Sequence, residues 1–355
     1  MSPSGPRPIR IAVAARSPLL RARSSGLIAG WDDLRLTGVF RSAEDLLRGL
    51  DGEPADLLLL GTEMLAGPAN PLLQAIRQRW RRPVILLASS AADPRILAGL
   101  EGGAAAFLLL PPLDGSGEAL EAALGVIREV AARDGSPPAT RGRMQPAPGT
   151  PGREAVPSAG ALVVIGASTG GPRAVQTVLE ALPGELNASL LIGVHMPLTF
   201  TALYAERLSR ICRLRVREAG DGDPLPPGVA GVLPGGCQAE VFRRGGMPRV
   251  RLRPRREGEF HAPSLDLLMS SAAAALGSAV VGILLTGMGQ DGARGMGEIR
   301  RAGGWTVAES RETALIFGMP GEAIRSGSAA AILPLHEIPA ALVERCGVLP
   351  ANAHD

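Results

Sequence analysis

The sequence predicts an α/β protein built from two domains and a linker. A chain of 355 residues ordinarily divides into two domains. Short apolar runs alternate with amphipathic segments in two separate stretches, which is the pattern of parallel sheets covered by helices. Between them, residues 134–160 hold six Pro and five Gly without an apolar face. We therefore expect domains over residues 1–133 and 161–355, joined by an extended linker over 134–160.

The first domain is predicted to be a doubly wound sheet of five parallel strands. Its buried strands are the apolar runs at 9–15, 34–40, 55–61, 83–89 and 105–111. The amphipathic segments between them, which are predicted helices, include 42–50, 70–79 and 117–133.

The second domain is predicted to be doubly wound and mostly parallel, with an antiparallel edge hairpin. Its strands are predicted at 161–167, 189–196, 279–287, 305–310 and 330–334. Its helices are predicted to begin near Pro172, Leu198, Ser264, Gly292 and Phe317. The run 228–235 interrupts the alternation, and the segments 239–244 and 247–254 predict a hairpin around Gly245 and Gly246.

The charge of the chain argues against a nucleic-acid partner. The formal net charge is only +3, and all 37 basic residues are Arg. Arginines alternate along one expected strand, at positions 249, 251, 253 and 255. Because no aromatic stacking platform accompanies them, we expect a solvated edge strand or a contact with acidic protein helices.

Cysteine usage and hydropathy favour a cytoplasmic protein. The three cysteines are odd in number and lack the CxxC spacing of a metal or redox site, which fits a reducing compartment. No signal peptide is expected at the N-terminus. The uncharged stretch 267–290 is predicted to be a helix followed by a buried strand, so we expect no membrane insertion.

Three polar residues are expected at the carboxyl ends of strands in the second domain, where open α/β sheets bind ligands. Ser168 lies in the glycine-rich turn after 161–167, His195 ends the next strand, and Asp291 follows 279–287. A serine, a base and an orienting carboxylate in this arrangement predict nucleophilic catalysis.

Each of these three signals has a structural alternative. The turn around Ser168 also suits a phosphate cradle, although it lacks the G-x-G-x-x-G order and a P-loop lysine. His195 alone fits a structural histidine, and Asp291 fits a helix N-cap. For His261, beside the expected helix start at Ser264, we expect a surface position, with a place near the cleft as the alternative.

Five motifs in order along the second domain resemble the catalytic domain of chemotaxis-type protein-glutamate methylesterases, the CheB family. They are GASTGGP (166–172), HMPLTFTALYAERL (195–208), REAGDGDPL (217–225), LLTGMGQDGARGM (284–296) and FGMPGEAI (317–324). The resemblance implies a serine hydrolase with Ser168 as nucleophile, His195 as base and Asp291 as orienting acid, and with Thr169 and Met288 beside the oxyanion. It implies no metal and no organic cofactor.

Two positions depart from the family pattern. Gln238 stands where the family commonly has a histidine, and Ala262 stands where it commonly has an arginine. Because both are expected beside the substrate cleft, the rate or the receptor preference is expected to differ.

The resemblance also implies that the first domain has the flavodoxin-like fold of a phosphorylation receiver. The positions that carry the receiver's acidic residues, acceptor aspartate, hydroxyl and lysine read Ala15 with Arg16, Gly61, Ala88 and Leu110. We therefore predict a pseudo-receiver that is not phosphorylated. Four roles remain open for this domain: it covers the catalytic cleft, binds a signalling partner, supports dimerisation or serves only as a folding partner.

The expected function is removal of methyl esters from glutamates on the cytoplasmic helices of chemoreceptors, regulated independently of receiver phosphorylation. Deamidation of receptor glutamines shares the same acyl-enzyme chemistry. The alternative is a catalytically weak or inactive scaffold that binds a receptor or signalling partner.

Overall fold

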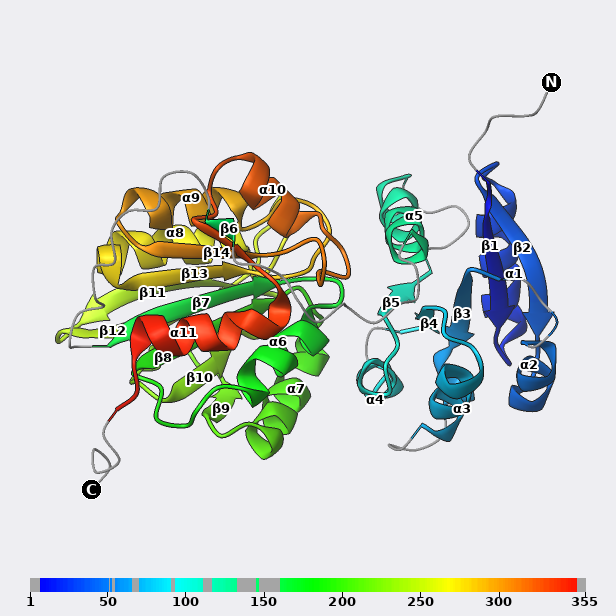
Figure 1. Ribbon diagram of the computed structural model, residues 1–355, viewed down its shortest axis with the longest axis horizontal. Helices are drawn as coiled ribbons and strands as arrows, with labels where there is room; N and C mark the ends of the chain where they lie inside the picture. The colour runs from blue at the N-terminus through cyan, green and yellow to red at the C-terminus, as the bar shows by residue number, and fades with distance from the viewer. Residues whose placement is uncertain are drawn as a thin grey trace. The chain divides into compact units, whose positions relative to one another are not determined.

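The chain consists of two compact units, which correspond to the two alternations of the sequence (Figure 1). The computed structural model describes residues 7–50, 52, 55–65, 70–90, 93–110, 117–132, 145–146 and 160–349. Contacts divide it into Met1–Pro137 and Pro138–Asp355. Apart from 145–146 and 160, the predicted linker lies outside the described residues.

The first unit contains the predicted sheet of five parallel strands. The strands are β1 (Ile9–Ala14), β2 (Leu34–Phe40), β3 (Leu57–Gly61), β4 (Val84–Ala88) and β5 (Ala106–Leu109). Their order, β2-β1-β3-β4-β5, is the flavodoxin-like order and confirms the predicted fold. Every residue of the central strands β3 and β4 is buried, because helices cover both faces of a parallel sheet.

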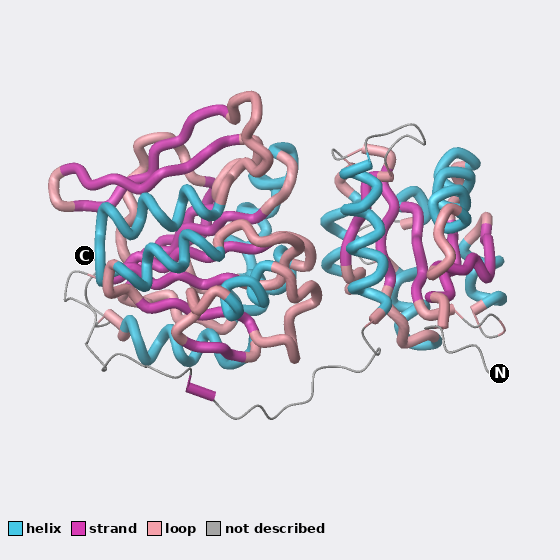
Figure 2. The backbone as a smooth tube through the Cα atoms, turned by 90° about the horizontal axis from the view of Figure 1, so that it is seen from above, coloured by secondary structure: helices cyan, strands magenta, loops and turns pink. Residues whose placement is uncertain are grey.

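Helices flank this sheet on both sides (Figure 2). They are α1 (Pro18–Ala29), α2 (Ala43–Gly49), α3 (Pro71–Arg79), α4 (Arg95–Glu101) and α5 (Gly117–Ala131), with a 3₁₀ turn η1 (Thr62–Met64) directly after β3. Ser17 and Ser42 begin α1 and α2 by accepting backbone N–H groups of the first turn, at 3.3 and 3.1 Å.

The second unit is built on a sheet of eight strands in the order β6-β15-β14-β13-β7-β8-β10-β9. The strands are β6 (Gln145–Pro146), β7 (Ala161–Ala167), β8 (Ala188–Val194), β9 (Arg215–Glu218), β10 (Val229–Val232), β13 (Val280–Leu284), β14 (Trp305–Glu309) and β15 (Ala331–Leu333). All neighbours are parallel except β15 and β6. The mostly parallel sheet is therefore confirmed, and β10 within 228–235 is one of its parallel strands.

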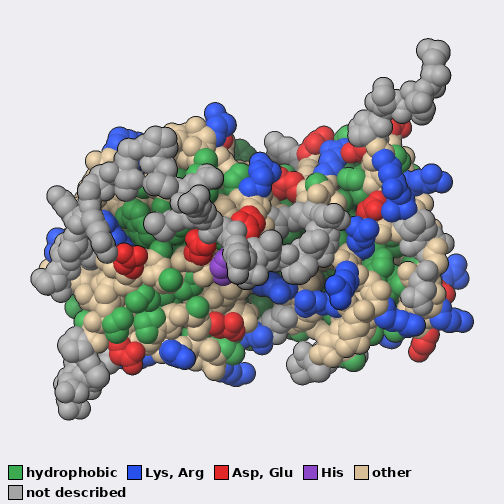
Figure 3. Space-filling view, in the orientation of Figure 1, with side chains coloured by type: hydrophobic (Ala, Val, Ile, Leu, Met, Phe, Trp, Pro, Cys, Tyr) green, Lys and Arg blue, Asp and Glu red, His purple; other side chains and the backbone are tan. Residues whose placement is uncertain are grey.

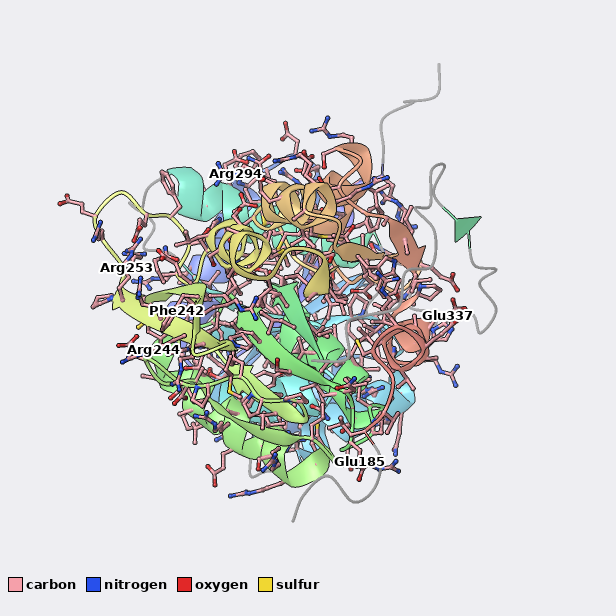
Figure 4. The ribbon with its side chains drawn as sticks, turned by 90° about the vertical axis from the view of Figure 1, so that its left-hand side faces the viewer. Glu185, Phe242, Arg244, Arg253, Arg294 and Glu337 are labelled. Carbon is pink, nitrogen blue, oxygen red and sulfur yellow. The ribbon has the colours of Figure 1, made fainter. Side chains whose placement is uncertain are left out.

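The predicted hairpin is formed by β11 (Cys237–Arg244) and β12 (Met247–Pro254), which pair antiparallel as a separate sheet of two strands. Phe242, Arg244 and Arg253 mark it at one side of the unit (Figure 4). Two of its arginines contact neighbouring side chains: Arg253 pairs with Glu259, and Arg251 lies over the ring of Phe242 at 4.7 Å. On the face drawn in Figure 3, basic and acidic side chains are interspersed.

Helices cover both faces of the eight-stranded sheet (Figure 1). One face carries α8 (Leu265–Leu276), α9 (Ala293–Arg301) and α10 (Met319–Arg325), and the other carries α6 (Gly171–Glu180), α7 (Leu198–Ile211) and α11 (Ile338–Cys346). The 3₁₀ turns η2 (Gly277–Ala279) and η3 (Leu335–Glu337) complete the unit. The uncharged stretch 267–290 is a helix followed by a strand, as predicted, and no described helix is long and apolar enough to cross a membrane.

The order of the strands reverses between β7 and β13, which predicts the position of a ligand crevice. The chain passes from β7 to β8 on one side, and later returns to β13 on the other side of β7. Such a reversal leaves a crevice at the carboxyl ends of the two strands, which is where open α/β sheets bind ligands.

Candidate active site

The predicted catalytic residues lie at this carboxyl edge. Ser168 directly follows β7, and His195 directly follows the neighbouring strand β8. The backbone N–H of His195 donates to the carbonyl of Ala167 at 3.1 Å, which fixes the two strand ends side by side. Asp291 lies in the loop after β13, the neighbour of β7 on its other side.

The glycine-rich turn holds Ser168 at the end of β7. Its N–H donates to the carbonyl of Thr286 at 3.0 Å, and its carbonyl accepts from Gly171 N–H at 2.8 Å. Gly170 has φ +78, and a Cβ there would lie 2.8 Å from a methyl group of Leu315. Only glycine fits both this backbone conformation and the space available.

Gly287, on the other side of the crevice, leaves room for Ser168. A Cβ at this position would lie 2.8 Å from the Cβ of Ser168 and 2.2 Å from Sδ of Met319. Sequence reasoning missed this requirement, although Gly287 lies within the motif at 284–296. The glycine is therefore a spatial part of the site.

His195 and Asp291 form a hydrogen-bonded pair. Nε2 of His195 lies 3.0 Å from Oδ2 of Asp291, and their side chains are 13% and 7% exposed. The carboxylate also accepts the N–H groups of Leu265 at 2.8 Å and Asp266 at 3.0 Å. Burial alone would raise the pKa of Asp291, but these hydrogen bonds outweigh it and lower the pKa to about 2.

This geometry gives the two nitrogens of His195 different roles. A permanent carboxylate facing Nε2 favours the tautomer with the proton on Nε2, which leaves Nδ1 as the acceptor. Within the described residues the hydroxyl of Ser168 forms no hydrogen bond to His195. The structure thus joins two of the three predicted residues by a hydrogen bond and places the third at the adjacent strand end. Hydrogen bonds between a catalytic serine and its base are often long before substrate binds.

Thr169 and Met288 are both half-buried in the loops that follow β7 and β13. The Thr169 carbonyl accepts from the hydroxyl of Thr286 at 2.9 Å, and that hydroxyl accepts from Ile316 N–H at 2.8 Å. Gly287, next to Met288, accepts from Met319 N–H at 2.8 Å through its carbonyl. Buried Thr286, which sequence reasoning also missed, therefore links the loop after β7 to the segment before α10.

His261 is exposed, as predicted, and it also lies beside His195 at the site. Its ring stacks on that of His195, with centroids 4.5 Å apart and planes within 4°. Burial, and then the proximity of His195, lower the pKa of His261. A pocket of about 350 Å³ opens beside the two rings, and its wall includes Leu198, Arg255 and the 85% exposed Phe260.

The two departures from the family pattern take different positions. Ala262 lines the pocket. Gln238 is only 2% exposed and lies behind the segment that carries His261, because its amide donates to the His261 carbonyl at 2.7 Å and accepts from Ser264 N–H at 2.8 Å. Gln238 is therefore a structural support of that segment.

His195, His261 and Asp291 are the described residues whose ligand atoms come close enough to hold a metal, all within 4.8 Å of one another. Both oxygens of Asp291, however, already accept backbone N–H groups from the start of α8. A metal would have to compete with those donors and with His195.

The carboxyl edge of the first unit has apolar residues at positions where a receiver carries functional side chains. Ala15, Ala88 and Leu110 are buried and apolar. A Cβ at Gly61 would lie 2.5 and 2.6 Å from the carboxylate oxygens of Glu63, so this carboxylate fills the space of a side chain at position 61. Glu63 accepts the N–H of Ser17 at 3.0 Å, in the wall of a pocket of about 330 Å³.

A serine beside a histidine–carboxylate pair, at the carboxyl edge of a mostly parallel sheet, is typical of α/β serine hydrolases. The family model described as CheB methylesterase matches residues 163–342. The chain belongs to the CheB methylesterase family.

Full-length relatives and one solved structure agree with this assignment. A protein-glutamate methylesterase/protein-glutamine glutaminase of Geobacter sulfurreducens is 33% identical over 97% of this chain and 99% of its own. One of the same name from Chromohalobacter salexigens is 36% identical over 95% and 96%. The crystal structure of the Thermotoga maritima CheB methylesterase catalytic domain covers 52% of this chain and 98% of its own, with 36% identity and a TM-score of 0.51.

Proposed function

We propose that the protein removes methyl esters from glutamate side chains on the cytoplasmic helices of chemoreceptors, and that it deamidates receptor glutamines at the same site. The observation that carries this proposal is the buried His195–Asp291 pair beside Ser168 at the crevice between β7 and β13. We assign the catalysis to residues 161–355. We propose that the reaction takes place in the cytoplasm, where these receptor helices lie.

In the proposed mechanism Ser168 Oγ attacks the ester carbonyl while Nδ1 of His195 accepts its proton. Asp291 stabilises the resulting imidazolium through Nε2. The imidazolium then gives the proton to the departing methoxy group, and methanol leaves an acyl-enzyme on Ser168. Water attacks this ester with His195 as base, which restores the serine and releases the glutamate. With a glutamine substrate the first leaving group is ammonia.

The oxyanion is stabilised by the backbone N–H groups of Thr169 and Met288. Within the described residues neither N–H is taken by another group, and both belong to loops that flank Ser168. The start of α6 adds a favourable dipole. Loss of one such donor costs about 2.7 to 4 kcal/mol of transition-state stabilisation in comparable sites.

The test is release of methanol from a methylated receptor fragment by the full chain and by Ser168→Ala. We expect release that the substitution abolishes, and ammonia release from an unmodified fragment that disappears in parallel. A wild-type chain that binds the fragment but releases neither product would instead support the scaffold alternative.

We further propose that the first unit is a pseudo-receiver, so that catalysis does not depend on its phosphorylation. Supporting this, Gly61 offers no acceptor and Asp56 is held in a bidentate pair by Arg10, near the start of β3. Mass spectrometry after treatment with acetyl phosphate and Mg²⁺ is expected to find no phosphoryl group in this unit. A label on Glu63 or Asp56 would contradict the proposal.

A further inference from the structure

We propose that His261 is a positioning residue for His195, holding the base in the orientation in which Nε2 faces Asp291 and Nδ1 is left for the serine. The inference rests on the proposed function. His261 presents a flat ring parallel to that of His195 at a centroid distance of 4.5 Å. A rotation of the His195 ring out of its plane would strike this neighbour.

The segment that carries His261 is anchored from behind. The side chain of Gln238, in β11, bonds to the carbonyl of His261 and to the N–H of Ser264, so one amide fixes both ends of the segment 261–264. Gly236 N–H donates to the carbonyl of Ala262 at 2.9 Å. A ring mounted on such a braced segment restricts its partner far more than a ring on a free loop.

The same segment continues into the helix that holds Asp291. Ser264 begins α8, and the N–H groups of Leu265 and Asp266 donate to the two oxygens of Asp291. Asp266 in turn accepts the N–H groups of Gly292 and Gly295 at the start of α9, at 3.0 and 2.8 Å. One continuous stretch of chain therefore fixes the positions of both His195 and its carboxylate.

The chemistry of His261 suits this role. A neutral imidazole stacks on a base without competing for its charge, and its π face favours an imidazolium that forms during the reaction. The charged and titratable groups near His261 are His195, Asp291 and Asp266, together with Arg255 in the pocket wall. Partial burial and the proximity of His195 lower the pKa of His261, which favours its neutral form.

The test compares His261→Ala with His261→Phe, which keeps a flat ring and removes both nitrogens. If the stacked ring positions His195, His261→Ala lowers kcat about tenfold with KM nearly unchanged, and His261→Phe recovers most of kcat. Gln238→Leu, which removes the support of the segment, is expected to lower kcat in the same direction. The matched control is His336→Ala, because His336 is an exposed histidine in η3.

A second readout separates this inference from the proposed function. The rate at which a fluorophosphonate labels Ser168 reports the activation of the serine without any receptor. If the wild-type chain labels but releases no methanol, the proposed function fails while the effect of His261 stays measurable. Equal labelling rates and equal kcat in wild type and His261→Ala would overturn the positioning role. So would a His261→Phe variant as slow as His261→Ala.

Discussion

Each of the two units has a glycine at or just beyond the carboxyl end of a central strand. The space that the missing side chain leaves is used differently in the two units. Gly287 leaves room for Ser168, because a Cβ at position 287 would lie only 2.8 Å from the Cβ of the serine. At Gly61 the cleared space is filled by the carboxylate of Glu63, tied to Ser17. The same layered architecture therefore carries a serine beside a histidine–carboxylate pair at one edge and a Glu63 carboxylate in the space of a side chain at the other, because side chains and not the fold decide the chemistry.

The two edges also treat buried charge differently. Asp291 is 7% exposed, and backbone donors from α8 together with His195 compensate its burial. In the first unit Asp93 takes a bidentate pair from a surface arginine, Arg95, and a hydroxyl from Thr62. The Asp93 side chain is also only 8% exposed and accepts the backbone N–H of Arg95 at 3.0 Å, so both carboxylates are buried on backbone donors. They differ in the side chain that each one faces, which is an arginine at Asp93 and the imidazole of His195 at Asp291.

The largest effect is expected from filling the space of Gly287. Gly287→Ala places a methyl group against the backbone and Cβ of Ser168 and shifts the proposed nucleophile. A displacement of this size typically costs about 100-fold in rate, measured here as methanol release. Gly30→Ala is the control, because a Cβ there meets nothing closer than 3.7 Å. Full activity in Gly287→Ala would contradict the close packing of Gly287 against Ser168.

Asp291 is expected to couple stability to acid pH. Its pKa is about 2 in the folded protein against 3.8 for an unperturbed aspartate, so the unfolded chain takes up the proton first. The resulting stability, about 2 kcal/mol, is fully present above roughly pH 4 and is lost as the pH falls toward about 2.

The measurement compares wild type with Asp291→Asn by guanidinium unfolding. Fluorescence of Trp305 reports the second unit once Trp31 and Trp80 are replaced by Phe in both chains. The difference in unfolding free energy between the two chains is expected to shrink as the pH falls from 5 to about 2. A difference that stays constant over this range would show that Asp291 is not held by the pair and the α8 donors.

The smallest effect is expected at the carboxyl edge of the first unit. Gly61→Ala displaces the carboxylate of Glu63 and breaks its bond to Ser17, for a loss of about 1 kcal/mol. In a Glu63→Ala background the same change has nothing to displace. A double-mutant cycle in unfolding free energy is therefore expected to show a coupling of about 1 kcal/mol, and additive effects would mean that Glu63 does not occupy this space.

The sequence predicted the two sheets because their strands are continuous apolar runs. It missed β9 because this strand is only four residues long and has exposed arginines at alternate positions, so it contains no continuous apolar run. It missed β6 because two residues are too few to show a period. Strand pairing at an edge is decided by neighbours in space, which composition does not reveal.

At the site, residues that directly follow strands were predictable and residues that act across space were not. Ser168 and Asp291 follow predicted strands and His195 lies at the end of one, each within a distinctive motif. Gln238 lies in the hairpin and His261 lies in the segment after it, so no sequence periodicity relates either residue to His195. The sequence suggested that Gln238 lies beside the cleft, yet its buried amide serves the backbone behind it.

We propose Ser168 as the nucleophile and His195, held by Asp291, as the base that activates it. Peptide mapping after treatment of the full chain with a fluorophosphonate identifies the residue that reacts. We expect a single adduct on Ser168, formed far more slowly in His195→Ala. An adduct on another residue, or labelling of Ser168 at the same rate without His195, would contradict it.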